Sequence, residues 1–178
     1  MDSINKQQPE HNRENLTNED AVKKIKEMVE SAKTCFFCTD LKENKPFKTR
    51  PMSVQKVDDM GNLWFLSSVD SNKNEQIEDK SAVQLLFQGD PHTDFLSIYG
   101  YASISKDKNK IEELWEPLAK TWFTEGKDDP RITVIKVQPE DGYYWDTKHG
   151  KIVAFAKMAI GALTGKTFDD SVEGTVKP

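Results

Sequence analysis

The feature that most constrains this fold is a succession of short apolar segments separated by turn residues. Leu63 to Ser68 follows a Gly-Asn pair, and the segments Ala82 to Gln88 and Asp94 to Ser105 alternate apolar and polar side chains. A period of two is typical of strands with one face on a core. Similar patterns predict strands over 34–40, 46–57, 131–137 and 142–146. Short strands with regular turns favour a mainly β (α+β) fold, an antiparallel barrel with peripheral helices.

Helical periodicity appears on either side of these strands. Apolar residues at helical spacing predict a helix that Thr17 caps and that ends near Ala32. An insert over 106–122 predicts two short helices, because Pro117 interrupts the pattern. A last strand over 151–155 and a helix over 156–163 are expected before Gly165. We predict a mobile N-terminal tail over 1–15, one domain over 16–165, and a loosely held polar tail over 166–178.

Charge and composition exclude several classes of protein. The net charge of −5 over 178 residues argues against nucleic-acid binding. No apolar run reaches the ~18 residues of a membrane span, and the N-terminus lacks the apolar core of a signal peptide, so we expect a cytoplasmic protein. Cys35 and Cys38 stand at CxxC spacing, but no second Cys/His pair supplies a metal site. We expect two buried, reduced thiols on opposite faces of a strand.

The junction between the strand at 63–68 and the next helix is rich in phosphate-binding side chains. Ser67, Ser68, Ser71, Asn72 and Lys73 lie there, and Asp70 or Ser71 is the expected N-cap. A helix N-terminus offers free N–H groups and the positive end of the helix dipole, to which hydroxyls and an ammonium add. The alternative is that these residues cap the helix with no ligand present.

Two further stretches combine groups that suit a flat, charged ligand. Arg50-Pro51-Met52-Ser53 places a guanidinium beside a proline. The proline predicts an edge, a bulge, or a place where the backbone serves something other than the strand ladder. Tyr143-Tyr144-Trp145 cannot direct every ring inward, so at least one ring must meet a surface, a ligand or another chain. Trp115 is expected in the core. For Trp122 and Phe123, contact with a ligand and contact with a partner subunit are equally open.

Taken in order, these stretches resemble the flavin-binding split barrels related to pyridoxamine 5′-phosphate oxidase. The Trp122-Phe123-x-x-Gly126 loop and the Tyr144-Trp145-Asp146 ending are similar to bacterial general stress proteins within that group. The resemblance covers about 17–165 and implies an antiparallel split β-barrel. It also implies a flavin site made by the following residues: Arg50, Pro51, Met52, Ser53, Leu66, Ser67, Ser68, Ser71, Asn72, Lys73 and Trp145.

The resemblance also implies the ligand and the assembly. The cofactor is flavin, and a compact phosphate pocket fits FMN more simply than FAD, although the sequence does not choose between them. Split barrels bind flavin between two chains, so we expect a homodimer in which Trp145 comes from the neighbouring subunit. Surplus aromatic residues support this expectation, because Phe95, Tyr99 and Tyr101 share a strand face opposite the apolar set.

Two departures from the oxidase weaken any assignment of its reaction. Asn72 stands where the oxidase has an arginine, and residues 146–151 do not match its Arg-x-His-x-Arg arrangement. Three hypotheses therefore stay open: a flavin-dependent oxidoreductase of unknown substrate, a non-catalytic flavin-binding or storage protein of a stress response, and a flavin-free interaction domain. Flavin itself carries the electron chemistry, so no catalytic side chain is named.

Overall fold

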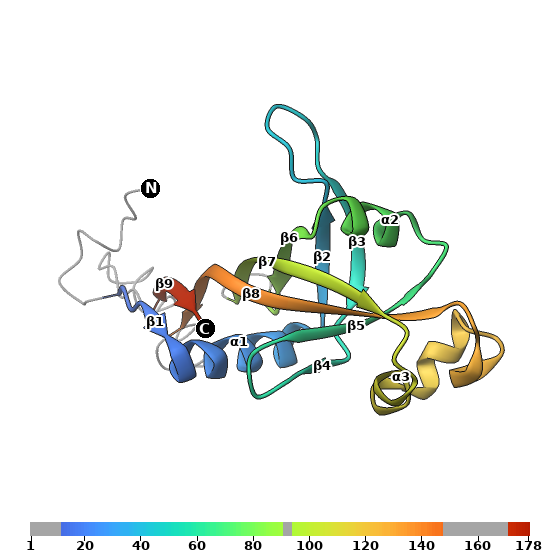
Figure 1. Cartoon of the computed structure of the whole chain (residues 1–178). Coiled ribbons are helices and arrows are strands. Elements are labelled where there is room, and N and C mark those ends of the chain that lie inside the picture. The colour runs from blue at the N-terminus through green and yellow to red at the C-terminus, as the bar shows by residue number, and fades with distance from the viewer. Residues whose placement is uncertain (1–11, 91–93, 148–170) are drawn as a thin grey trace.

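A computed structural model shows one nine-stranded sheet with helices on its faces and at one end (Figure 1). The structure describes residues 12–90, 94–147 and 171–178. The strands are β1 (Leu16–Thr17), β2 (Thr34–Thr39), β3 (Lys48–Ser53), β4 (Lys56–Val57), β5 (Leu63–Ser68), β6 (Ala82–Gln88), β7 (Phe95–Ser105), β8 (Ile132–Thr147) and β9 (Ser171–Lys177). The helices are α1 (Asn18–Ala32), α2 (Asn72–Asp79) and α3 (Lys108–Leu114), with 3₁₀ turns η2 (Pro117–Thr121) and η3 (Gly126–Asp128).

The sheet is mixed, which corrects the prediction that it is antiparallel. Its order is β1-β9-β8-β7-β6-β2-β3, and β5 joins β8 and β4 beside this path. The named strands pair antiparallel except β1 and β9, which run parallel. The parallel pair arises because the segment before α1 lies along the C-terminal strand. β3 ends the path, so an edge strand is the one of the alternatives predicted for Pro51 that the structure shows.

The long strand β8 organises the sheet. The whole of β7 pairs with one edge of β8. On the other edge of β8, β5 pairs with the first part of the strand and β9 with the last part. The two strands predicted over 131–137 and 142–146 are therefore one strand. Polar residues around Pro139 resemble a turn, but a bulge between Tyr99 and Gly100 keeps the ladder continuous. A Cβ on Gly100 would lie 2.2 Å from the Gln138 carbonyl oxygen, so a side chain does not fit there.

The segment predicted as one strand over 46–57 forms two strands with different partners. β3 pairs with β2, whereas β4 pairs with β5. Between them, Val54 N–H donates to the Lys33 carbonyl and Gln55 N–H donates to the Trp64 carbonyl. The chain changes neighbours at this point, which the local pattern does not reveal.

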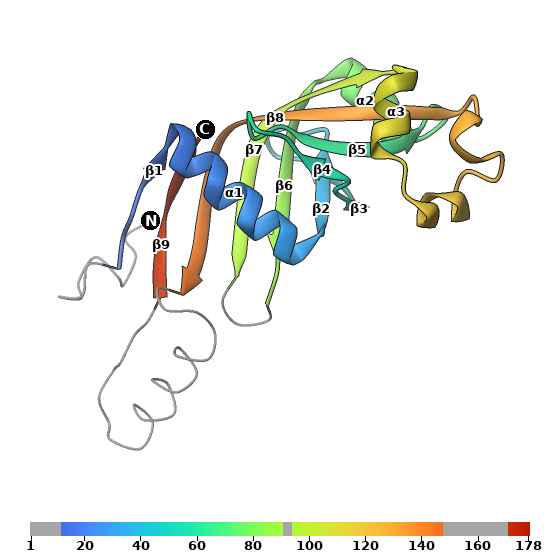
Figure 2. The ribbon, with the colours of Figure 1, turned by 90° about the horizontal axis from the view of Figure 1, so that it is seen from below.

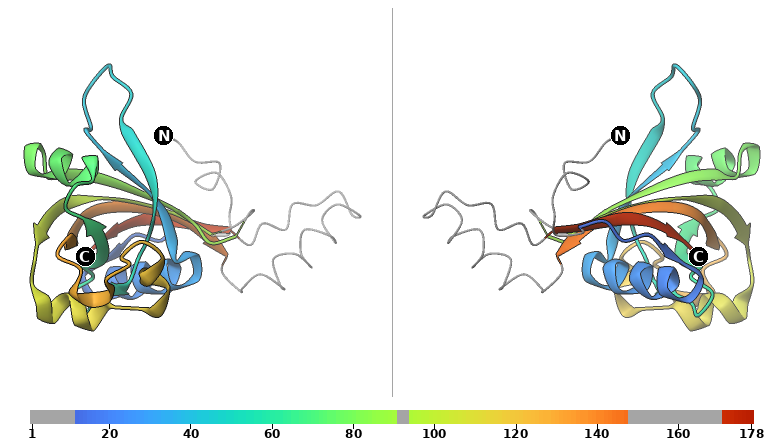
Figure 3. Two further views of the ribbon diagram at one scale, coloured as in Figure 1. Left: turned by 90° about the vertical axis from the view of Figure 1, so that its right-hand side faces the viewer. Right: turned by 90° about the vertical axis from the view of Figure 1, so that its left-hand side faces the viewer.

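Two apolar clusters hold the elements together. The larger one packs α1, through Ile25, Met28 and Val29, against the inner side chains of the sheet, among them Tyr144; Figure 2 shows α1 crossing that face. The smaller cluster lies between α3, η2 and the strands β5 and β8, and includes Phe123. Pro117 separates the two helical pieces of the insert, as predicted. Figure 3 shows the hairpin between β2 and β3 projecting from the body.

Several predictions for single residues are decided by burial. Cys35 and Cys38 are both buried and free, as expected. Thr17 is the N-cap residue of α1, as predicted, but its side chain makes no capping hydrogen bond. Trp115 is half-buried against the smaller cluster. Phe123 is buried, whereas Trp122 is 65% exposed. Contact with a ligand and contact with a partner subunit therefore stay as alternatives for Trp122 alone.

Residues 12–15 and 171–177, which fall within the two predicted tails, are part of the folded structure. Asn12 is buried, and Glu14 N–H donates to the Glu173 carbonyl, so 12–15 belong to the folded body. Residues 171–177 form β9 rather than a loose tail, because the exposed edge of β8 offers backbone partners and Val172 and Val176 reach the core. The expected elements over 151–163 lie outside the described residues. Among the described residues, no helix is long and apolar enough to cross a membrane.

Candidate functional site

The start of α2 lies at a corner where β2, β3 and β5 come close to the helix. We call this place the α2 corner and define it by five residues: Thr39, Arg50, Ser71, Lys73 and Gln76. Ser71 is the N-cap of α2, as one of the two predicted alternatives has it. Its hydroxyl makes no capping bond and instead contacts Ser67 Oγ at 3.2 Å and Asn74 Oδ1 at 3.2 Å. The first-turn N–H groups of α2 therefore lack a side-chain cap within the described parts of the chain.

A buried polar network fixes the strand-to-helix junction from below. Ser67 Oγ donates to Asn74 Oδ1 at 2.7 Å, and Asn74 Nδ2 donates to Thr133 Oγ1 at 2.8 Å. Thr133 Oγ1 in turn donates to the Ser67 carbonyl at 3.1 Å. These three side chains are each at least 97% buried, and the hydrogen bonds among them satisfy their polar groups and support the corner. The sequence analysis placed Ser67 among the binding residues; its side chain is occupied here.

Arg50 reaches the corner from β3 and is held by three oxygen acceptors. Nη1 donates to Thr39 Oγ1 at 2.6 Å and to the Phe37 carbonyl at 3.4 Å, and Nη2 donates to Gln76 Oε1 at 2.8 Å. Burial lowers the pKa of the Arg50 guanidinium. Thr39 and Gln76 were absent from the sequence predictions, because neutral polar residues on separate elements carry no local signal of shared function.

Lys73 brings a second positive charge to the same corner. Burial and the nearby Arg50 both lower the pKa of its ammonium, while Asp70 opposes this effect. Among the described residues, no carboxylate lies within 4 Å of Lys73 Nζ or of the Arg50 guanidinium. Two cations close together beside a helix whose N-terminus has no side-chain cap are the groups that an anion site uses, so the α2 corner is a candidate anion site.

The other predicted residues are distributed over different faces. Met52 is half-buried against the larger cluster on the same face of β3 as Arg50, whereas Pro51 and Ser53 are exposed on the opposite face. Leu66 packs against the smaller cluster beneath the insert, and Ser68 and Asn72 lie at the rim. The structure therefore brings Arg50, Ser71 and Lys73 together, and leaves Leu66 directed elsewhere.

Trp145 lies far from the α2 corner of its own chain. Trp145 stands 12 residues after Thr133, the residue of β8 that lies beneath the corner. At ~3.3 Å per residue the two are ~40 Å apart along a straight strand, and the bend of β8 shortens this distance. Its ring is 41% exposed and packs on Tyr143 with centroids 4.7 Å apart. Phe36, Leu86 and Tyr101 are exposed on neighbouring strands. Tyr144 is fully buried, so it does not add to this surface.

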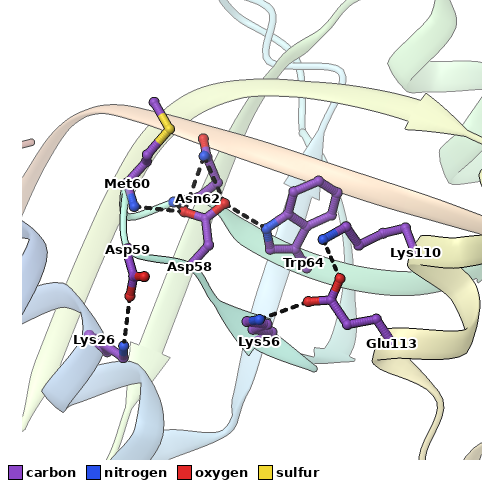
Figure 4. Close-up of polar contacts among 9 residues, drawn as sticks. All are labelled: Lys26, Lys56, Asp58, Asp59, Met60, Asn62, Trp64, Lys110 and Glu113. Carbon is purple, nitrogen blue, oxygen red and sulfur yellow. Dashed lines mark hydrogen bonds and ion pairs between the residues drawn. The ribbon is translucent and has the colours of Figure 1, made fainter.

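A second polar cluster, drawn in Figure 4, has a different character. Asp58 accepts hydrogen bonds from the N–H groups of Met60 and Asn62 and from Trp64 Nε1. Glu113 pairs with Lys56, which fastens α3 to β4, and with Lys110 within α3. Lys110 Nζ lies 4.5 Å from the centroid of the Trp64 ring, which joins α3 to β5. Every carboxylate in the figure has a partner there, which indicates a structural cluster. Within the described residues no group of His, Cys, Asp and Glu could hold a metal ion.

Two curated proteins are similar in sequence to this chain. Protein bli-3 of Neurospora crassa is 26% identical over 66% of this chain and 61% of its own, and general stress protein 26 of Bacillus subtilis is 27% identical over 44% and 58%. The chain thus spans about 60% of the length of these curated relatives.

Solved structures show the same fold. A candidate general stress protein 26 from Jannaschia sp. superposes with a TM-score of 0.74 at 22% identity, covering 89% of this chain and 99% of its own. The general stress FMN/FAD binding protein of Xanthomonas citri gives a TM-score of 0.61 at 25% identity, covering 74% and 91%. The sequence profile described as pyridoxamine 5′-phosphate oxidase like matches residues 20–169. This chain therefore belongs to the pyridoxamine 5′-phosphate oxidase like family.

Proposed function

We propose that this protein binds a phosphorylated flavin, FMN in preference to FAD, with its phosphate at the α2 corner. The observation that carries the proposal is the electrostatic proximity of Arg50 and Lys73 beside α2, whose N-terminus lacks a side-chain cap, with no carboxylate of the described residues within 4 Å of either cation. A phosphate monoester carries about −1.5 to −2 charges near neutral pH, which two cations and backbone N–H groups compensate. The name of the Xanthomonas citri relative, an FMN/FAD binding protein, supports this ligand class.

The residues around the corner suggest how the rest of the ligand lies. Met52 faces the same side of β3 as Arg50 and offers an apolar contact for a ring. Pro51, Ser53, Leu66 and Ser67 contribute through backbone groups in this proposal, because their side chains point away or are already bonded. Bound flavin would supply electron transfer, and the protein would supply binding and orientation.

We further propose a homodimer built on the outer face of a split barrel. A ligand held at the α2 corner is remote from Trp145 of the same chain, so the partner subunit's Trp145 would complete the site. Phe36, Leu86 and Tyr101 give this face the exposed apolar side chains expected of an interface. Light scattering tests the assembly: a mass near 20.3 kDa with flavin still bound would overturn it.

An oxidoreductase of the cytoplasm is the activity we favour, and a non-catalytic flavin-binding protein of a stress response is the second candidate. The mismatches at Asn72 and over 146–151 separate either function from that of the oxidase. Absorbance and fluorescence spectra of the purified protein, before and after addition of FMN, test flavin binding. Lack of binding to FMN, FAD and riboflavin refutes it. Reduction of bound flavin by NADH or NADPH, with turnover to an acceptor, separates the two candidates.

A further inference from the structure

Arg50 differs from the other paired cations of this structure in the chemistry of its partners. Arg131 takes both oxygens of Asp129, and Lys56 and Lys110 take Glu113. Arg50 is held instead by a hydroxyl, an amide oxygen and a carbonyl, all of them neutral. The guanidinium is therefore fixed in place, and no carboxylate of residues 12–90, 94–147 or 171–178 forms an ion pair with it.

Thr39 and Gln76 form this neutral support together. Thr39 Oγ1 accepts from Arg50 Nη1 at 2.6 Å and donates to Gln76 Oε1 at 2.5 Å, as a hydroxyl can do in both directions. Gln76 Oε1 also accepts from Arg50 Nη2 at 2.8 Å, so both acceptor positions of the amide oxygen are used and its orientation is set. Thr39 is fully buried and Gln76 half-buried, which limits exchange with water.

A carboxylate in place of the Gln76 amide would hold Arg50 equally well in geometry. It would also neutralise the guanidinium and compete with any incoming anion. The amide avoids this competition: it orients the donor fork and leaves the charge to the ligand. Orientation without neutralisation is what a phosphate site requires from residues behind its arginine.

We propose that Thr39 and Gln76 are positioning residues that hold Arg50 for phosphate, and that the neutrality of Gln76 makes the corner select phosphorylated flavin over riboflavin. This inference rests on the proposed flavin function for its ligand, but not for its anion chemistry. Thr39 and Gln76 act on the ligand's phosphate only through Arg50. The quantity that tests the proposal is therefore the dissociation constant of riboflavin divided by that of FMN, and not the affinity for flavin in general.

Gln76→Glu is the decisive variant, with Asn109→Asp as its control. Asn109 is exposed on the first turn of α3, and its replacement makes the same amide-to-carboxylate change in net charge. Each protein is titrated with FMN and with riboflavin, following flavin fluorescence. We expect Gln76→Glu to weaken FMN binding about 10- to 150-fold, the range for a charge-assisted hydrogen bond, with riboflavin binding changed less than about threefold. Asn109→Asp should match the wild type for both ligands.

Inorganic phosphate separates this inference from the proposed function. Wild-type protein without flavin should gain thermal stability with phosphate, and Gln76→Glu should not. Equal stabilisation of both proteins, or equal loss of FMN and riboflavin affinity in the variant, overturns the inference. If phosphate stabilises the wild type more than Gln76→Glu but neither FMN nor riboflavin binds, the proposed function fails while the positioning of Arg50 for phosphate stands; FMN binding no tighter than riboflavin overturns the inference. If Gln76→Glu folds poorly, Gln76→Met and Thr39→Val serve instead, because each removes a hydrogen bond to Arg50 without adding charge. Both variants must lower the dissociation constant of riboflavin divided by that of FMN.

Discussion

Replacing Lys73 with methionine removes one charge from the α2 corner while keeping an aliphatic side chain of similar length. Loss of a charge-assisted hydrogen bond to phosphate costs about 1.5–3 kcal/mol. At 1.4 kcal/mol per decade, FMN should bind about 10- to 150-fold more weakly. Riboflavin, which lacks the phosphate, should bind the variant and the wild type equally. Titration of both ligands by flavin fluorescence measures these changes.

The same substitution should not destabilise the protein without flavin, and this opposite response makes the prediction sharp. Burial and the neighbouring Arg50 both disfavour the charged ammonium, as its lowered pKa shows, and only Asp70 favours it. Methionine removes the repulsion and keeps the packing, so the urea midpoint should stay the same or rise. Lys23→Met, at an exposed position of α1, is the control. Unchanged FMN affinity, or a parallel loss of affinity and stability, would refute the assignment of Lys73.

Further predictions concern pH, thiol reactivity and the chain termini. FMN affinity should be retained below the pKa of Lys73 and should fall as the pH rises through that pKa. The fall should begin at a lower pH than the pKa of an ordinary lysine would give, because the pKa of Lys73 is lowered. The Lys73→Met variant should not show this loss at alkaline pH. Burial raises the pKa of Cys35 to about 12, so a thiol reagent at pH ~8 should label it only after unfolding; rapid labelling of the native protein would contradict its burial. Gly174→Ala should lower the free energy of unfolding in urea by about 1–3 kcal/mol, because the added Cβ would lie 1.7 Å from the Glu14 carbonyl oxygen. An unchanged urea midpoint would mean that the contact between residues 12–15 and β9 contributes nothing to stability.

Local patterns in the sequence were sufficient for elements whose evidence is local. Ala82–Gln88 was predicted with its observed bounds, and β5, β7 and α1 were predicted to within a residue or two, because alternation and helical spacing record which face is buried. Charged and capping residues were also recognisable. Arg50, Ser71 and Lys73 stood out by type and by position, and the structure places them in one corner.

Only the tertiary structure decided which segments pair and which neutral groups meet. The continuity of β8, the division between β3 and β4, and the pairing of β9 with β8 each depend on ladder partners far away in the sequence. Thr39 and Gln76 likewise acquire a role only when β2 and α2 converge on Arg50. Hydrophobic periodicity reports the face that a residue turns to the core, but hydrogen bonding between distant elements depends on their position in space, which no local pattern contains.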